Sequence, residues 1–430
     1  MHRVAVIGGG PAGCSAAFLL RGAGLDVVLL EAAGHVGGRT HTFRAKGIAL
    51  DSGAGFFTSF YPHVERYVRD LGLAHDRTPV PSGTTFSCAG RRAVLDRADP
   101  WSFWAYPFLS ARGKTRFLAY GAGLTLKRGR FDPFDPQVLS KHDDRSAAEA
   151  AREALGEDVY QYLVRPSIES FWFFSCEEIS QALMLALYAR AAGSRFYTLA
   201  GGMDQICTRL VKGIDVRTGC RASAIHARSE DEIAIEWEHG DMPHAETFDG
   251  AVVATTASQA DWLTRKLPPS MVTAVQRMFL GSQRYVANVH CAYLAEGELP
   301  RGVTFSCGPG ELPVNAVGTR PAGSGTLVQV FLGRGPSEEL AGSPLDEVSA
   351  EAWRLGRSFH PELPESARTF ATFKRAEAIP VHEVGRYKLA ARFATEQRPP
   401  VVFAGDYLAT AAVEGAVRSG AWASRVLLDR

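Results

Sequence analysis

A glycine-rich turn between a short apolar strand and a helix constrains the fold of this chain more than any other feature. Residues 4–7 are apolar and mostly β-branched, and Gly8, Gly10 and Gly13 follow them at the spacing Gly-x-Gly-x-x-Gly. An Ala-rich helical pattern continues to Arg21, and a second apolar run comes after a glycine-rich break. Strand, glycine turn, helix and strand in this order predict a βαβ unit, which implies a parallel sheet.

The same turn has the features of a dinucleotide-binding site. Gly8 permits the tight turn, Gly10 lets the backbone approach a pyrophosphate, and Gly13 lets the helix pack closely against the strand. The N-terminus of the helix offers N–H donors and partial positive charge to phosphate. Glu31 ends the second apolar run, where its carboxylate can accept hydrogen bonds from ribose hydroxyls and disfavours the 2′-phosphate of NADP. We therefore predict dinucleotide binding, with a purely structural βαβ unit as the alternative.

Gly37, Gly38 and Arg39 follow this unit and favour FAD over NAD. Together with the glycine turn and the acidic residue, they resemble the opening of the flavoprotein superfamily of amine oxidases, protoporphyrinogen oxidases and phytoene desaturases. The resemblance implies that Arg39 reaches the pyrophosphate and that the two glycines let the backbone approach the cofactor. A flexible surface loop is the alternative interpretation of this tripeptide.

Later segments resemble the same superfamily in the same order along the chain. Residues 51–55 resemble the segment that runs under the flavin, with Asp51 where Glu is usual, and residues 201–204 resemble a Gly-Gly-Met turn before a helix. Residues 401–406 and 413–420 resemble the C-terminal flavin motif, in which the Asp bonds the ribitol and the helix start faces the flavin. These later segments add a set of cofactor-binding candidates: Gly53, Ala54, Gly55, Gly405, Asp406, Val413, Gly415 and Ala416.

The resemblance and the residue patterns together predict an α/β protein, α+β overall, in three parts. A Rossmann-type FAD-binding domain is expected from three discontinuous segments: residues 1–80, 200–262 and 395–430. Residues 81–199 have a mostly helical, aromatic-rich pattern and are expected to form a helical subdomain, and residues 263–394 a mixed-sheet substrate domain. Further expected elements are a meander at 223–227, 232–237 and 251–254 that rejoins the first sheet, strands at 285–294 and 326–332, and helices at 345–359 and from 413.

The segments expected to contact the substrate differ in sequence from each branch of the superfamily that the chain resembles. Residues 373–386 resemble the A-I-P-x-x-x-x-G-H signature of protoporphyrinogen oxidase-like members, but Arg386 replaces the His. No cysteine follows Cys307, so we expect FAD to be held without a cysteinyl–flavin bond. Bulky rings at residues 171–174 stand where a glycine-rich turn is expected, so the resemblance does not transfer the tetrapyrrole substrate.

Three activities follow from these departures. Amine oxidases of the superfamily hold the amine between two aromatic rings, which suits a developing cationic centre. Tyr387 could form one wall, but Ala412 stands at the partner position. We therefore predict removal of a hydride equivalent from a large apolar or cyclic metabolite, with reoxidation by O₂ and release of peroxide, and place amine oxidation second. A redox-neutral isomerase or mutase is a further alternative, although mutases usually carry Gly-Gly-Asn at residues 37–39.

Candidate catalytic residues lie near the inferred flavin motifs. They are Tyr407, Tyr387 and His382, with Glu414 and Lys388 as further candidate bases. If the hydride leaves a neutral substrate directly, no protein base is needed. Several aromatic residues could line an apolar pocket or could belong to an ordinary core: Phe56, Phe57, Tyr106, Tyr407 and residues 171–174.

Residues 100–131 contain six basic side chains and no acidic one, with Trp101 and Trp104 among them. Basic segments with interleaved aromatic rings are typical of a membrane interface. The resemblance adds that the corresponding region of protoporphyrinogen oxidases faces the membrane. Peripheral membrane contact is therefore a hypothesis, and a solvated basic face or an anion-binding surface are the alternatives.

The net charge and the cysteine pattern limit the partners and the cellular compartment that we expect. The formal net charge is +1, so nothing in the overall charge indicates a nucleic-acid partner. Seven cysteines are spread singly without a Cys-x-x-Cys pair, which indicates free thiols in a reducing compartment. Because the first strand begins almost at the first residue, we expect no signal peptide. No apolar run reaches the length that spans a bilayer. We expect a cytoplasmic enzyme with a small-molecule substrate and no metal.

Overall fold

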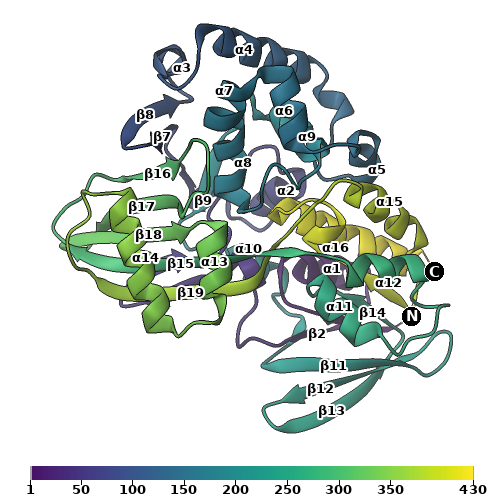
Figure 1. Ribbon diagram of the computed structural model, residues 1–430. Coiled ribbons are helices and arrows are strands. Elements are labelled where there is room, and N and C mark those ends of the chain that lie inside the picture. Colours follow the sequence, from purple (N-terminus) through teal and green to yellow (C-terminus); the bar gives the residue numbers. More distant parts are fainter. Residues whose placement is uncertain (1, 430) are drawn as a thin grey trace.

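A five-stranded parallel sheet forms the centre of the first domain in the computed structural model, which describes residues 2–429 (Figure 1). Its strands come from segments far apart in the sequence, and every neighbouring pair is parallel. In spatial order they are β10 (Asp215–Thr218), β2 (Asp26–Glu31), β1 (Arg3–Ile7), β14 (Gly250–Val253) and β20 (Val401–Phe403). Layers cover both faces of this sheet, which explains why its central strands are continuous apolar runs.

Helices α1 (Pro11–Gly22) and α16 (Val413–Leu428) pack together over one face of the sheet. Their contact is close enough to require glycine, because a Cβ atom on Gly420 would lie 2.1 Å from the carbonyl oxygen of Ala12. The hydroxyl of Ser15 also donates to the carbonyl of Val417 at 2.9 Å. Two further helices, α2 (Pro62–Asp70) and α10 (Gln205–Leu210), pack beside this pair.

The opposite face of the parallel sheet is covered by a separate antiparallel meander and three helices. These elements are β11 (Cys220–Ala227), β12 (Ile233–His239), β13 (Met242–Phe248), α11 (Ala257–Thr264), α12 (Ala274–Gly281) and α15 (Arg386–Glu396). The predicted return of the chain to the first sheet is confirmed, because residues 250–253 lie in the parallel sheet. The prediction was wrong in the third strand of the meander, which is β13 instead. The strand that completes the meander, β13, is polar and mostly exposed, so it lacks the alternating pattern by which strands are found.

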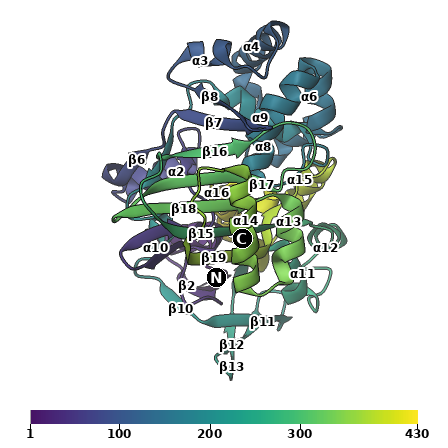
Figure 2. The ribbon, with the colours of Figure 1, turned by 60° about the vertical axis from the view of Figure 1, so that its left-hand side comes forward.

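A seven-stranded mixed sheet forms the second layer of the molecule. Its order is β19 (Arg368–Pro380), β15 (Tyr285–Glu296), β18 (Gly325–Leu332), β17 (Val314–Ala322), β16 (Gly302–Ser306), β7 (Gly83–Cys88) and β8 (Arg91–Asp96). Helices α13 (Arg334–Glu339) and α14 (Leu345–Phe359) cover one face, as Figure 2 shows. The other face packs on the hairpin of β3 (Thr42–Ala45) and β4 (Ile48–Asp51).

A helical region lies beyond the β7–β8 edge of this sheet, at the top of Figure 1. Its helices are α3 (Pro100–Ala105), α4 (Ala111–Leu126), α5 (Pro136–Leu139), α6 (Ala147–Leu155), α7 (Glu157–Val159), α8 (Arg165–Trp172) and α9 (Gln181–Ala191). The region expected to be mostly helical therefore opens with a hairpin, because β7 pairs in parallel with β16 and joins the mixed sheet. A small sheet of β5 (Phe57–Thr58), β9 (Phe196–Leu199) and β6 (Arg77–Pro79) connects it to the first domain.

Two further findings concern the whole chain between residues 2 and 429. All seven cysteines are free thiols, and six of them are buried, in agreement with the prediction from their spacing. Within this range, no helix combines the length and the apolar character that crossing a membrane requires.

Candidate functional site

The N-terminus of α1 is shaped as a backbone cradle. Gly8 has φ +107°, and a Cβ atom there would lie 2.6 Å from the carbonyl oxygen of Ala254. A Cβ atom on Gly13 would lie 1.9 Å from the carbonyl oxygen of Gly8, so strand and helix meet without room for a side chain. A Cβ atom on Gly10 would meet nothing within 4 Å, and no side chain caps the helix. The helix N-terminus therefore faces open space that a phosphate can reach.

Glu31 is fixed beside this cradle at the carboxyl end of β2. One carboxylate oxygen accepts from the backbone N–H of Gly9 at 2.6 Å, and the other accepts from Ala33 at 2.7 Å. Each carboxylate oxygen has two acceptor positions, so both keep capacity for the hydroxyls of a ribose. The carboxylate thus lies ready for the role that its spacing predicts.

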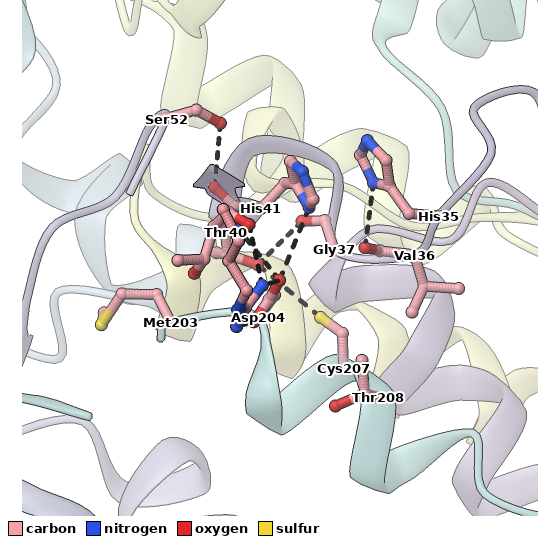
Figure 3. A network of polar contacts seen from close by, with 12 residues as sticks. His35, Val36, Gly37, Thr40, His41, Ser52, Met203, Asp204, Cys207 and Thr208 are labelled. Atoms are coloured by element: carbon pink, nitrogen blue, oxygen red, sulfur yellow. Dashed lines mark hydrogen bonds and ion pairs between the residues drawn. The ribbon is translucent and has the colours of Figure 1, made fainter. Parts of the chain in front are cut away.

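The turn at residues 37–41 closes over the cradle, and Asp204 holds it there (Figure 3). The N–H of Gly37 donates to the carbonyl of Gly9 at 2.8 Å. Asp204 accepts from the N–H of Thr42 at 3.1 Å and from both terminal nitrogens of Arg44 at 2.9 and 2.8 Å. Burial opposes ionisation, but the hydrogen bonds from Arg44 outweigh it and lower the pKa of Asp204 below its ordinary value. The motif at residues 201–204 therefore acts by anchoring the turn.

Arg39 joins the N-terminal and C-terminal motifs. Its guanidinium forms two parallel hydrogen bonds to the carboxylate of Asp406, at 2.8 and 2.7 Å, a geometry that only Arg provides. Its carbonyl accepts from the N–H of Ala54 at 3.0 Å, and a Cβ atom on Gly53 would lie 2.1 Å from the same oxygen. Gly53, Gly55 and Gly38 are exposed, so backbone is accessible along this edge.

The start of α16 completes the assembly. The helix begins at Val413, as predicted, and no side chain caps it. A Cβ atom on Gly415 would lie 2.1 Å from the carbonyl of Thr410. Ser419 Oγ accepts from the N–H of Gly405 at 2.8 Å, which ties the strand end to the helix. Ala416 is buried one turn into α16. Segments from residue 8 to residue 416 are thus brought to one edge of the parallel sheet.

The sequence profile of one family spans nearly the whole of this chain. The profile described as "Flavin containing amine oxidoreductase" matches residues 11–428. The chain belongs to this family. Membership implies a flavin cofactor, and the open cradle at Gly10, the fixed carboxylate of Glu31 and the Arg39–Asp406 pair fit one.

Curated relatives of this flavoprotein match parts of it. It is 30% identical over 172 residues to protoporphyrinogen oxidase 2, chloroplastic/mitochondrial, of Arabidopsis thaliana, covering 39% of this chain and 32% of the relative. It is 27% identical over 292 residues to an L-amino-acid oxidase of Notechis scutatus scutatus, covering 64% and 54%. The matches therefore span between a third and somewhat more than half of these relatives' lengths.

Solved structures share the fold over the full chain. A protein from Exiguobacterium sp. 255-15, provisionally described as a protoporphyrinogen oxidase, superposes with a TM-score of 0.77 at 17% identity, covering 100% of this chain and 99% of that one. Putrescine oxidase bound to putrescine superposes with a TM-score of 0.72 at 19% identity, with the same coverage. These similarities confirm the predicted fold class.

The three predicted catalytic residues of this flavoprotein are all enclosed. Tyr407 has no exposed surface, its ring packs against Phe279 at 6.2 Å between centroids, and burial raises its pKa. Tyr387 is equally buried and stacks on His382 at 4.9 Å. Burial lowers the pKa of His382 to about 3, with Arg386 adding to the effect, and both its ring nitrogens lack partners. Their roles stay predictions.

The remaining candidate bases have structural contacts. Glu414 is fully buried and accepts from the N–H of Val64 at 2.9 Å and from both the N–H and Nδ1 of His63, so it caps α2. Lys388 is exposed, and its backbone N–H donates to Asp143. Arg386, at the position of the signature His, is held at the end of α12, where its guanidinium donates to the carbonyl of Phe279 at 2.6 Å.

The structure adds polar residues that sequence reasoning missed. Asn288 and His290 lie two positions apart on β15, and Arg375 lies opposite Asn288 on β19. All three belong to the sheet face that packs on the β3–β4 hairpin. Two polar residues at this spacing in an otherwise apolar central strand share one face, and that pattern was the available signal.

A separate cavity of about 630 Å³ lies between α8 and α13. Its walls are largely charged and include Arg152, Arg165, Glu169 and Arg334. None of its lining residues belongs to the cofactor motifs, so it is not part of the site built above.

Proposed function

We propose that this flavoprotein is an FAD-dependent oxidoreductase that removes a hydride equivalent from a large apolar or cyclic metabolite. FAD would be held without a covalent bond, and its electrons would pass to O₂ with release of hydrogen peroxide. The observation that carries this proposal is the convergence on one sheet edge of the α1 cradle, Glu31 and the Arg39–Asp406 pair. When bound, FAD supplies the hydride acceptor, which no side chain provides.

The chain's own residues bind and orient the cofactor in this proposal. The N–H groups at the start of α1 and Arg39 would hold the pyrophosphate, Glu31 the adenosine ribose and Asp406 the ribitol. The uncapped start of α16 would stabilise negative charge on the flavin ring. The other proposed contacts are Gly8, Gly10, Gly13, Gly37, Gly38, Gly53, Ala54, Gly55, Gly405, Val413, Gly415 and Ala416.

An apolar substrate is supported by a line of aromatic rings between the three parts of the molecule. Phe171 of α8 lies 5.7 Å from Phe56, which follows the 51–55 segment, and 4.9 Å from Phe305 of β16. The indole N–H of Trp172 donates to the carbonyl of Ala411 at 2.7 Å, directly before α16. Rings from separate elements thus exclude water beside the start of α16, which strengthens electrostatic interactions there.

Amine oxidation is the second candidate, because L-amino-acid oxidases are among the relatives. It requires aromatic walls around a cationic centre, and the proposed wall, Tyr387, is stacked on His382 without exposed surface. This arrangement favours the first candidate.

Cofactor binding is tested by a pair of glycine variants at the two ends of α1. Gly10→Val adds side-chain atoms where no protein atom lies within 4 Å, so they would obstruct only the pyrophosphate. Gly22→Val adds the same atoms where nothing lies within 4 Å at the other end of the helix. We expect Gly10→Val to lose bound FAD at unchanged apoprotein stability, measured by absorbance and urea denaturation. FAD retention equal to that of Gly22→Val would contradict the proposed site.

The reaction is tested by anaerobic bleaching of the flavin in the purified holoprotein. The panel contains porphyrinogens, carotenoid precursors, neutral cyclic compounds and primary and secondary amines, followed by air and a peroxide assay. We expect bleaching by a neutral cyclic compound and peroxide on reoxidation. Conversion of a substrate without net oxidation would replace the oxidase by the redox-neutral alternative, and bleaching by amines alone would establish the second candidate.

We also propose that the outer surface of α3 and α4 contacts an anionic membrane interface. Trp101 is 76% exposed and Leu126 is 89% exposed, and both lie in the basic 100–131 segment, which contains no acid. Five of its six basic side chains are exposed, whereas Lys114 is buried and donates to the carbonyl of Trp104. Exposed apolar residues beside exposed basic ones match the chemistry of anionic lipid headgroups over acyl chains. An apolar substrate dissolved in a bilayer would then be drawn from it.

A further inference from the structure

The face of the mixed sheet that packs on the β3–β4 hairpin is apolar at both ends and polar in the middle. At one end Ala292 and Leu327 pack on Leu50. At the other end Val286 joins the core of the helical region, together with Ala411. Between these two apolar contacts, the central positions of β15 and β19 are polar: Asn288, His290 and Arg375.

His290 and Asn288 form a pair with free hydrogen-bonding capacity. His290 Nδ1 lies 3.0 Å from Asn288 Oδ1, and the ring of His290 is stacked between Phe373 at 4.7 Å and Phe331 at 5.1 Å. With Nδ1–H donating to Oδ1, two buried atoms have no partner: Nε2 of His290, an acceptor, and Nδ2 of Asn288, a donor. His290 is only 1% exposed, and unpaired buried groups are costly, so a donor and an acceptor on a bound ligand would satisfy both atoms.

His290 is a neutral acceptor in this environment. Burial, together with the nearby charge of Arg375, lowers its pKa to about 3. Nε2 therefore keeps its lone pair at physiological pH. It is too weak a base to take a proton from carbon, but it can accept a hydrogen bond.

Arg375 makes the same place unfavourable for cations. Its guanidinium donates to the carbonyl and, at 3.0 Å, to the hydroxyl of Ser52, and within residues 2–429 no carboxylate lies within ion-pair distance of it. Burial and the charge of Arg39 lower its pKa. Asp406 is engaged by Arg39, and Glu377 accepts from Ser258. A second positive charge beside Arg375 would be repelled strongly where water is excluded.

We infer that the His290–Asn288 pair and Arg375 form the substrate-recognition edge of this site, which takes a neutral ring compound bearing an N–H or O–H group and rejects alkylammonium ions. The N–H or O–H donates to His290 Nε2, and Asn288 Nδ2–H is free to donate to an acceptor where the compound carries one. This inference rests on the proposed function and adds the charge and polar pattern of its substrate.

Two isomeric probes test the inference on the holoprotein. Tetrahydroquinoline carries a neutral aryl N–H near neutral pH, and tetrahydroisoquinoline has the same size but is an ammonium ion. Calorimetry measures the Kd of each, and bleaching of the flavin is recorded separately. We expect the neutral isomer to bind about tenfold or more tightly than the cation, as one repulsive charge contact implies.

Variants assign the preference to named residues. Arg375→Gln keeps a donor for Ser52 but removes the charge, and should let the cationic isomer bind, whereas Arg375→Lys should preserve its rejection. His290→Phe keeps the ring stack and should weaken the neutral isomer roughly three- to tenfold. His360→Phe is the matched control, because His360 is also buried and its Nδ1 also lacks a hydrogen bond, but it lies at the end of α14, 3.8 Å from Glu362.

The outcomes separate this inference from the proposed function. Equal binding of the two isomers, or no binding of the neutral one, overturns the inference even if another substrate bleaches the flavin. Equal effects of His290→Phe and His360→Phe also overturn it. The expected preference in calorimetry without bleaching by any substrate would preserve the recognition edge and reject the redox function.

Discussion

At the residue scale, His382 couples stability to pH. Its pKa in the folded chain is about 3 and the ordinary value is 6.5, so between these values the unfolded chain binds a proton that the folded chain excludes. The free energy of unfolding should therefore fall as pH drops from 6.5 towards 3. His382→Phe keeps a ring on Tyr387 and removes this titration. When the pH falls from about 7 to about 5, we expect the free energy of unfolding to decrease in both proteins. The decrease in His382→Phe should be smaller than that in the wild type by up to about 2 kcal/mol.

Urea denaturation at the two pH values measures this difference. His290 has a similar lowered pKa, so the variant should keep part of the pH dependence. His75→Gln is the control, because His75 is exposed and its replacement should leave the profile of the wild type unchanged. Superimposable profiles of wild type and His382→Phe would show that burial does not hold this ring neutral.

Residues whose chemistry depends on the local backbone could be predicted, and residues that depend on tertiary partners could not. Gly8 and Gly13 are identified by the strand and helix on either side of them, and the structure places both where a Cβ atom cannot fit. The proposed recognition role of His290 and Arg375 depends on their proximity in the folded sheet, where they lie on neighbouring strands although more than 80 residues separate them in the sequence. No spacing along the chain reports such a pair.

At the element scale, Glu414 connects two helices. It lies in the first turn of α16, yet its buried carboxylate caps the N-terminus of α2 through His63 and Val64. Glu414→Gln removes the charge and one acceptor from this cap. We expect a loss of about 1–3 kcal/mol in the free energy of unfolding, because hydrogen bonds to a buried charge are among the stronger ones.

Urea denaturation of matched variants measures the effect of this cap. Glu347→Gln removes an exposed carboxylate from the first turn of α14 and should cost no more than about 0.5 kcal/mol. Similar losses in the two variants would mean that Glu414 acts only on its own helix.

Elements with a clear hydrophobic period were predicted well, and polar or edge elements were not. Helix α14 and strand β18 lie within one residue of the expected bounds, because α14 has one apolar face and β18 is a nearly continuous apolar run. Strand β13 is exposed over most of its length, so no burial pattern marks it. The β7–β8 hairpin is a sheet edge whose partner, β16, lies more than 200 residues later, and pairing of that kind is a tertiary property.

At the scale of the whole molecule, the proposed substrate site lies between the parallel sheet and the helical region. The parallel sheet carries the proposed cofactor motifs, and α3 and α4 lie on the outer side of the helical region (Figure 1). These two helices carry exposed basic and apolar side chains. If that outer side meets a membrane, an apolar substrate has only the helical region to cross before it reaches the line of rings at Phe171. The location of the basic segment is then part of substrate supply.

Vesicle sedimentation tests this arrangement. The wild type should sediment with phosphatidylglycerol vesicles, bind phosphatidylcholine vesicles weakly, and lose binding at high salt, because salt screens exposed charges. Trp101→Ser and Leu126→Ser should each reduce binding about tenfold, the loss expected for one large apolar side chain that no longer enters the bilayer. Trp262→Ser removes a comparable ring from α11, where Trp262 is 41% exposed, and should leave binding unchanged. Equal losses in all three variants, or binding that is indifferent to lipid charge, would mean that the basic segment is an ordinary solvated face.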